Sequence, residues 1–215
     1  MNPLPYTDAE IATVYRVIAD RRDMRHFTPE AVDPHILHKL LTAAHQAPSV
    51  GLMQPWRFIR ITDSQLRAKI HVLVDEERLN TARALAEREN EFLKLKVEGI
   101  LQCAELLVTA LCDQREAHIF GRRTLPEMDL ASVSCAIQNL WLAARAEGLG
   151  MGWVSLFDPQ KLSQLLQIPT GAKPVAILCL GHVEAFYAQP MLVETGWASE
   201  KPLSELISEN SWKSS

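Results

Sequence analysis

The feature that most restricts the fold of this chain is a long apolar segment with a shorter apolar segment on either side of it in the sequence. Residues 130–148 (LASVSCAIQNLWLAARAEG) have the length of a helix, for which we expect Asp129 to be the N-terminal cap and Gly148 the end. The shorter segments, ELLVTALC (105–112) and PVAILCLG (174–181), are dense in Leu and Val, which predicts buried strands. No apolar run reaches the ~18 residues of a membrane-spanning helix. The pattern therefore predicts a helix packed on a sheet.

Shorter signals predict the remaining elements. Thr7 and Glu10 have the spacing of a capping box, for a helix that ends near Asp20. Asp33 and Pro34 have the residue types of a helix cap and of the first helical position. The other expected elements are a strand at 56–61, a helix at 63–78, a strand at 150–157 and a short helix at 159–167. Strands separated by helices indicate an α/β or α+β fold in one domain.

Charge and cysteine content exclude several classes of protein. Lys and Arg number 22 and Asp and Glu 26, which gives a formal charge of −4, whereas a general nucleic-acid binder usually has a basic face. The N-terminal sequence MNPLPYTDAE lacks the basic-then-apolar order of a signal peptide. The four cysteines are widely spaced, which is typical of buried free thiols in a cytosolic protein. We therefore expect a cytoplasmic protein with no nucleic-acid partner and no membrane partner.

Two segments of the single domain expected over residues 1–215 stand out in composition. Residues 80–100 are rich in Ala, Arg, Glu and Lys and contain few large apolar residues, which predicts a polar helical excursion that acts as a lid. Residues 184–215 mix Pro, Gly and charged residues, which is typical of an arm that wraps around another surface.

Three arginines lie within five residues after the first helix, in the order Arg21-Arg22-Asp23-Met24-Arg25. An anion relieves the repulsion among such closely spaced guanidinium groups, and the planar fork of arginine binds phosphate through paired hydrogen bonds. A phosphorylated ligand is therefore one interpretation of this Arg-rich turn. A solvated run of charges, in which Asp23 is a local partner, is the other.

Two loops carry further candidate binding groups. The loop 47–56 (APSVGLMQPW) offers backbone N–H groups and the Ser49 hydroxyl to a flat polar ring, or it is an ordinary turn with Trp56 in the core. Glycines at 148, 150 and 152 allow a close approach of the backbone to a ligand or to another element. They do not form a dinucleotide fingerprint, because they follow a helix and enter a strand. No histidine has metal-ligand spacing, so we expect no metal site.

Taken together, these segments resemble the flavin-dependent nitroreductase superfamily. The order of features is similar: an Arg-rich turn after the first helix, a PSxxxxQPW loop into a strand, a long apolar helix ending in GLGxGW, and PVAxLxLG. The resemblance covers roughly residues 10–205. It implies an α+β fold with a central, mostly antiparallel sheet flanked by helices, in an intertwined homodimer with FMN at the interface.

Inside the superfamily, the segments RRDMR, AAHQAPSVGLMQPWRF and CAIQNLWLAARAEGLGMGWVS resemble the 5,6-dimethylbenzimidazole synthases, which are flavin destructases of cobalamin (vitamin B12) biosynthesis. The resemblance implies an oxidoreductase that fragments reduced FMN with O2 into 5,6-dimethylbenzimidazole and D-erythrose 4-phosphate. FMN would then be the substrate rather than a recycled cofactor. A separate NAD(P)H-dependent flavin reductase would supply it in reduced form.

The same resemblance implies roles for individual residues. Asp23 stands where simple nitroreductases often have Ser, and it matches the catalytic aspartate of the destructases, while Ser155 in GWVS matches their catalytic serine. Leu52 stands where many nitroreductases have Asn, which suits a closed site that admits O2. The residues with an implied flavin-binding role are Arg21, Arg22, Asp23, Met24, Arg25, Ser49, Arg88, Val97, Ser155 and Lys201.

Two other functions stay open at this point. An FMN-dependent NAD(P)H nitroreductase or dehalogenase-like reductase would oxidise NAD(P)H rapidly and retain its flavin. A non-catalytic flavin-binding protein would hold FMN and leave reduced FMN intact in air, although it would need neither Asp23 nor Ser155. For any of these functions we expect a homodimer, in which half-exposed apolar residues of the long helix meet the partner; these are Leu140, Trp141 and Ala144.

Overall fold

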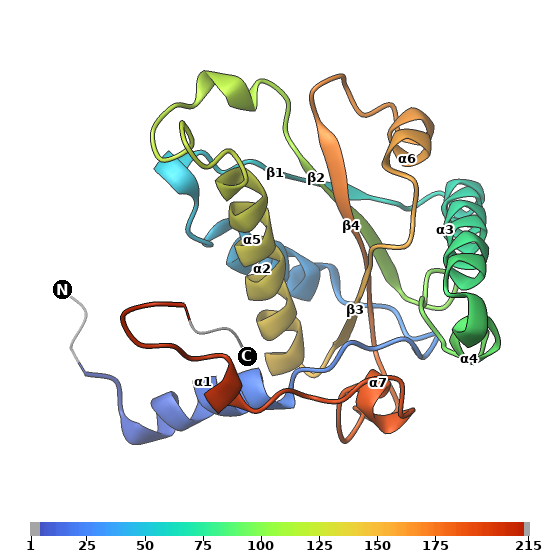
Figure 1. Ribbon diagram of the computed structural model, residues 1–215, viewed down its shortest axis with the longest axis horizontal. Coiled ribbons are helices and arrows are strands. Elements are labelled where there is room, and N and C mark those ends of the chain that lie inside the picture. The colour runs from blue at the N-terminus through green and yellow to red at the C-terminus, as the bar shows by residue number, and fades with distance from the viewer. Residues whose placement is uncertain (1–4, 213–215) are drawn as a thin grey trace.

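A four-stranded antiparallel sheet forms the centre of the computed structural model, which describes residues 5–212 (Figure 1). The strands are β1 (Trp56–Arg60), β2 (Glu105–Leu111), β3 (Gly150–Val154) and β4 (Lys173–Gly181), and their order is β1-β2-β4-β3. The two apolar segments predicted as buried strands are β2 and β4, the central pair, and every residue of β2 is buried. The expected α+β fold with an antiparallel sheet is confirmed.

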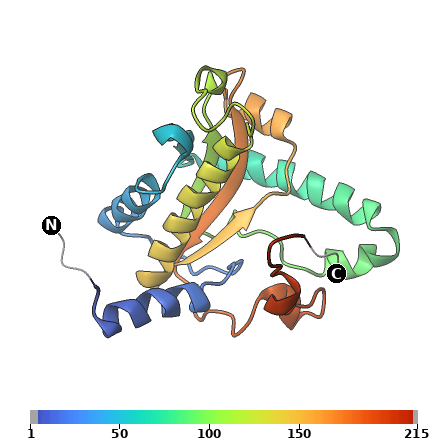
Figure 2. The ribbon, with the colours of Figure 1, turned by 60° about the vertical axis from the view of Figure 1, so that its left-hand side comes forward.

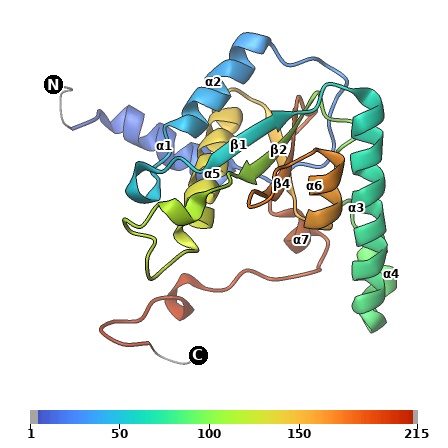
Figure 3. The same ribbon diagram turned by 90° about the horizontal axis from the view of Figure 1, so that it is seen from above.

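Helices cover both faces of the sheet. The long α5 (Met128–Ala146) and α2 (Pro34–His45) pack on one face, and α3 (Ser64–Ala84) and α6 (Pro159–Leu165) pack on the other. The view from above shows the three layers (Figure 3). Alternate residues of β2 enter the two layers, since Leu107 packs toward α5 and Leu106 packs toward α3. The apolar residues that shape the sequence pattern therefore form two cores.

The predicted helix caps are mostly confirmed. Thr7 and Glu10 form the capping box of α1 (Asp8–Asp20), and Asp33 accepts the N–H of His35 at the start of α2. The expectation that Asp129 caps the long helix is wrong, because α5 begins at Met128 without a side-chain cap. The Asp129 carboxylate is instead bound by two arginines of the preceding loop; these are Arg115 at 2.8 Å and Arg122 at 3.1 Å.

The polar segment 80–100 has a different layout from the one expected. α3 continues to Ala84 instead of ending near residue 78, and α4 (Glu89–Leu93) follows after a short 3-10 turn. Arg78 of α3 donates to the carbonyl of Leu93 at 2.6 Å, which fixes the end of α4 against α3. β3 ends at Val154, three residues before the expected end at 157.

The expectation that Leu140, Trp141 and Ala144 are half-exposed is wrong, because all three are buried in the core beneath the sheet. The exposed apolar surface lies elsewhere. None of the residues of α1 is buried, and the helix extends away from the sheet past one end of α5 (Figure 2). Its large exposed apolar side chains are Ile11, Val14, Tyr15 and Ile18.

The tail after β4 runs over the surface and then leaves the body of the molecule (Figure 3). It contains one short helix, α7 (Met191–Glu194), and beyond Trp197 its large apolar side chains are exposed; these are Leu203, Leu206, Ile207 and Trp212. The four cysteines are free thiols; Cys103 and Cys179 are buried as expected, whereas Cys112 is half-buried and Cys135 is exposed, contrary to the expectation. Among residues 5–212, no helix is long and apolar enough to cross a membrane.

Candidate active site

The Arg-rich turn (residues 21–25) lies beside β3 as a short extra strand. Asp23 forms a parallel bridge with Met151, and the N–H of Met24 donates to the Met151 carbonyl at 2.9 Å. A Cβ at Gly152 would lie 2.2 Å from the Met24 carbonyl oxygen and 2.4 Å from Nη1 of Arg25. Only glycine fits there, so the close approach predicted for the glycine cluster is to another element of the chain.

Asp23 and Arg25 form an ion pair that is fixed to the backbone of β3. One carboxylate oxygen of Asp23 accepts the N–H of Trp153 at 3.0 Å, and the other accepts Nη2 of Arg25 at 2.6 Å. The same Nη2 donates to the Trp153 carbonyl at 2.9 Å. The Arg25 side chain is 9% exposed and that of Asp23 is 42% exposed. The pair therefore presents mainly the carboxylate to its surroundings.

The surroundings change the acidity of Asp23. Burial raises the pKa of its carboxyl above the usual value, and the charge of Arg25 and the N–H of Trp153 offset only part of that rise. A carboxyl with a raised pKa exchanges protons closer to neutral pH, which suits a general acid or base. Asp23 thus combines a raised pKa with a fixed position.

A cavity of about 190 Å³ brings four of the predicted site residues together, namely Asp23, Arg25, Val97 and Ser155. Ser155 directly follows β3, and its hydroxyl makes no hydrogen bond to any described residue. Segments 80–100 and 184–215 both contribute apolar side chains to the cavity wall; these are Phe92, Leu95, Val97, Met191, Leu192 and Trp197. The carboxylate and the free hydroxyl therefore line the same, largely apolar cavity.

The other arginines of the turn are partly engaged by the protein. The guanidinium of Arg21 lies over the Trp141 ring, 4.6 Å from its centroid. Arg22 donates to the carbonyls of Ala19, Arg21 and Ala188. Two buried N–H groups, Nε of Arg22 and Nη1 of Arg25, have no partner among the described residues. Such unpaired cationic donors fit an anionic ligand, which would satisfy them.

Three other predicted site residues do not line this cavity, namely Met24, Arg88 and Lys201. The Met24 side chain is buried in the core. Arg88 forms a paired salt bridge with Glu91, stacks over the Trp197 ring at 3.5 Å from its centroid, and donates to the Trp197 carbonyl. Lys201 is exposed in the tail and does not line the cavity. Arg88 thus holds a residue of the cavity wall from outside.

Ser49 is not brought to Asp23 within one chain. Its hydroxyl accepts the N–H of Gln54 at 3.0 Å, and its loop lies near the start of α5, at the opposite end of that helix from the part of the molecule that holds α7 (Figure 1). Trp56 is buried, as one of the two interpretations of this loop requires. Two exposed apolar side chains lie at this loop: Leu52 (79% exposed) belongs to it, and Phe120 (84% exposed) packs beside Gly51.

Sequence reasoning missed the tail residues of the cavity wall. Trp197 lies about 40 residues after Ser155 in a polar segment, and nothing local indicates that it meets the cavity. The only available signal is that Trp197 is a large aromatic residue whose immediate neighbours, Gly196 and Ala198, are small.

Sequence comparison with known proteins identifies a family and close relatives. Residues 18–182 match the sequence model of the Nitroreductase family. The chain is 43% identical over 188 residues to 5,6-dimethylbenzimidazole synthase of Rhodospirillum rubrum, which covers 85% of this chain and 87% of that protein. It is 38% identical to a protein of the same name in Rhodobacter capsulatus, over 86% of this chain and 91% of that one.

Solved structures agree on the fold. A BluB-like flavoprotein from Clostridium difficile 630 superposes with a TM-score of 0.70 at 21% identity, covering 91% of this chain and 97% of that one. Oxidized iodotyrosine deiodinase, solved with FMN and 3-iodo-L-tyrosine bound, superposes with a TM-score of 0.72 at 21% identity, covering 93% of this chain and all of that one.

Proposed function

The chain belongs to the nitroreductase family, and from that premise we propose that it is a 5,6-dimethylbenzimidazole synthase. The reaction is the O2-dependent fragmentation of reduced FMN into 5,6-dimethylbenzimidazole, the lower ligand of cobalamin, and D-erythrose 4-phosphate. The observation that carries the proposal is the placement of Asp23 and Ser155 on one cavity, next to unpaired arginine donors. Relatives that share this name and match most of the chain support it.

Side chains of this chain can bind the flavin and exchange protons with it. Reduced FMN supplies the electrons and the ring atoms, so the protein must bind, orient and exchange protons. The unpaired Nη1 of Arg25 and Nε of Arg22 bind the phosphate end, together with Arg21. Asp23 takes up or delivers a proton, and the free hydroxyl of Ser155 donates or relays another.

The apolar wall of the cavity has a different role, which is to exclude water. We propose that segment 80–100 is a lid and segment 184–215 an arm of the single domain, and that together they keep water away from the bound flavin. Val97 contacts the flavin from this wall. Arg88 contacts the flavin only when its stack on Trp197 opens, because in the closed arrangement that stack and Glu91 occupy its guanidinium. Met24 contributes its backbone to flavin binding.

We propose that two copies of the chain form a homodimer. A cavity of about 190 Å³ is smaller than the roughly 300–1,000 Å³ of ligand pockets, so one chain offers an incomplete flavin site. Ser49 lies too far from Asp23 in the same chain, and the second subunit supplies it at the flavin edge, with Lys201 near the phosphate. The exposed apolar side chains of α1, the tail and the Ser49 loop provide the surface for such an interface.

The enzyme needs a supplier of its substrate, because FMN is consumed. We propose a separate NAD(P)H-dependent flavin reductase in the cytoplasm, a reducing compartment that suits the four free thiols.

Incubation of the protein with chemically reduced FMN in air, followed by mass spectrometry, tests the function. We expect 5,6-dimethylbenzimidazole and erythrose 4-phosphate in equal amounts. Rapid NAD(P)H oxidation with the flavin retained would assign a reductase instead, and reduced FMN that persists in air on the protein would assign a binding protein.

A further inference from the structure

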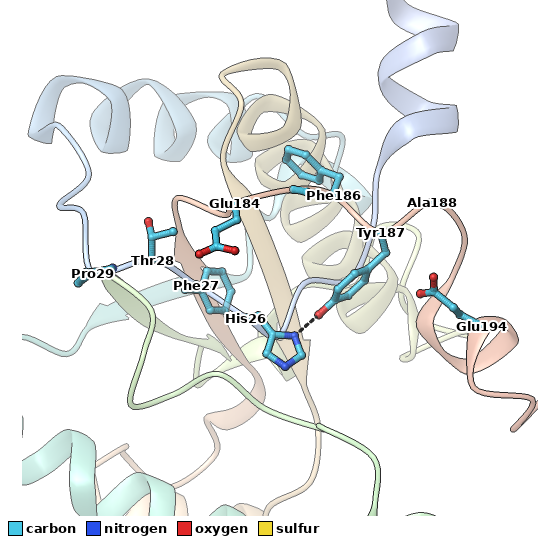
Figure 4. A pocket seen from close by; sticks show the side chains of 10 residues that line it. His26, Phe27, Thr28, Pro29, Glu184, Phe186, Tyr187, Ala188 and Glu194 are labelled. Carbon is cyan, nitrogen blue, oxygen red and sulfur yellow. Dashed lines mark hydrogen bonds between the residues drawn. The ribbon is translucent and has the colours of Figure 1, made fainter.

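A second cavity, of about 660 Å³, lies on the outer side of the Arg-rich turn, between residues 26–29 and the start of the tail (Figure 4). The hydroxyl of Tyr187 projects from the tail toward the turn and lies 2.7 Å from Nδ1 of His26. The same oxygen accepts the backbone N–H of Arg25 at 3.3 Å. One hydroxyl of the tail therefore contacts two consecutive residues of the turn that carries Asp23.

This contact fills a gap in the backbone hydrogen bonding of the turn. The N–H of Met24 donates to Met151, and the N–H of Thr28 donates to His182 at 2.9 Å. Between these two points, the N–H of Arg25 has no acceptor among the described residues other than Tyr187. Arg25 is buried, so loss of that acceptor leaves a buried donor unpaired.

Two neighbours of Tyr187 hold the same turn and the helix beneath it. The carbonyl of Ala188 accepts Nη2 of Arg22 at 3.0 Å. The ring of Phe186 lies under the guanidinium of Arg145 on α5, 4.0 Å from its centroid. Residues 186–188 thus form a strap across the turn, with Tyr187 at its middle.

We propose that Tyr187, itself oriented by His26, is a positioning residue for the Asp23–Arg25 pair. The proposal rests on the proposed function. Tyr187 does not line the cavity that holds Asp23, and it acts through Arg25, whose guanidinium binds the Asp23 carboxylate at 2.6 Å. Burial raises the pKa of Tyr187, so the hydroxyl keeps its proton at neutral pH while it contacts Nδ1 of His26.

The substitution Tyr187→Phe tests this role, because it removes the hydroxyl and keeps the ring. The readout is the fate of bound reduced FMN in a single turnover with excess protein in air: the ratio of 5,6-dimethylbenzimidazole to reoxidised FMN. A displaced acid or base loses on the order of 10- to 100-fold in proton transfer, so the ratio should fall by about that factor. A role in folding alone would lower the folded fraction and leave this ratio unchanged in the folded, flavin-bound protein.

Two further variants complete the test. Tyr6→Phe removes the hydroxyl of an exposed tyrosine and should keep the parent ratio. His26→Ala changes an exposed residue and releases the Tyr187 hydroxyl, so it should lower the ratio in the same direction, even if Tyr187→Phe does not fold. Parent-like ratios in folded Tyr187→Phe or in His26→Ala would overturn the inference. A parent protein that yields no product would instead overturn the proposed function.

Discussion

The backbone N–H of Trp153 donates to Oδ1 of Asp23 at 3.0 Å, and this bond fixes the carboxylate of the Arg-rich turn to the end of β3. Ser155 lies two residues further along, so the same strand places the acid and the hydroxyl on one cavity. Arg25 strengthens the link by binding both Asp23 and the Trp153 carbonyl. The candidate chemistry therefore depends on how the turn packs against one edge of the sheet.

Asp23→Asn should separate binding from chemistry. The substitution keeps the size of the side chain but removes its capacity to take a proton, so reduced FMN should still bind and still react with O2. Product formation should fall by ~10²–10⁴-fold, and the flavin should return as oxidised FMN, which mass spectrometry and absorbance measure. Product at close to the parent rate would show that Asp23 is only a partner of its neighbouring arginines.

The raised pKa of Asp23 predicts how stability depends on pH. The folded protein favours the protonated carboxyl, so this group's contribution to the free energy of unfolding is largest below the unfolded pKa of about 3.9. That contribution is lost as the pH rises through the raised pKa of the folded state. Thermal unfolding of the flavin-free parent, compared with Asp23→Asn, should show the parent losing stability relative to the variant across this window. A constant difference would contradict the shift.

Arg25→Ala should weaken recognition of the phosphate of FMN. A charge-assisted hydrogen bond is worth about 1.5–3 kcal/mol, so we expect FMN to bind roughly ten- to hundred-fold more weakly. Riboflavin lacks the phosphate, so it should bind the parent more weakly than FMN, and this preference should shrink in the variant, which keeps Arg21 and Arg22, as titration of flavin fluorescence would measure. Lys69→Ala removes an exposed positive charge from α3 and should change neither affinity. Equal affinities in the parent would argue against a phosphate site.

Gly152→Ala should displace the Arg-rich turn. The added Cβ meets a backbone carbonyl oxygen at 2.2 Å, which no side-chain rotation relieves. Overpacking of this kind costs about 1–3 kcal/mol, and FMN affinity should fall together with the melting temperature. Gly148→Asn is the matched control. A Cβ added at this position meets nothing within 4 Å, and asparagine tolerates the left-handed backbone at φ +77°. Unchanged stability and FMN affinity in Gly152→Ala would contradict the packing described here.

Charge in the proposed interface should dissociate the dimer. Phe120→Asp replaces an 84%-exposed ring beside the Ser49 loop with a carboxylate and should shift the protein toward monomer in sedimentation. FMN affinity should fall with it, because the second subunit then no longer supplies Ser49. Val72→Asp changes a 64%-exposed side chain of α3 and should leave both properties unchanged. A parent that sediments as a monomer at micromolar concentration would refute the dimer.

Local signals in the sequence determined most elements of this protein. The capping box of Thr7 and Glu10, the cap at Asp33 and the two apolar strands depend on contacts between near neighbours, or on the need to bury apolar residues, and the structure has them where they were predicted. The resemblance to the superfamily also pointed to Asp23, Arg25, Val97 and Ser155, which the fold brings to one cavity.

Tertiary structure alone decided where several other side chains lie. Asp129 has the residue type of a helix cap, but it lies in the first turn of α5, where two arginines of the preceding loop bind its carboxylate. Trp141 was expected to be half-exposed, yet it is buried, because the Arg21 guanidinium lies over its ring and the backbone carbonyl of Arg22 accepts its indole N–H. The positions of Trp197 and Tyr187 follow from the path of the tail across the turn, and such long-range contacts leave no periodic signal, because each depends on residues more than a hundred positions away.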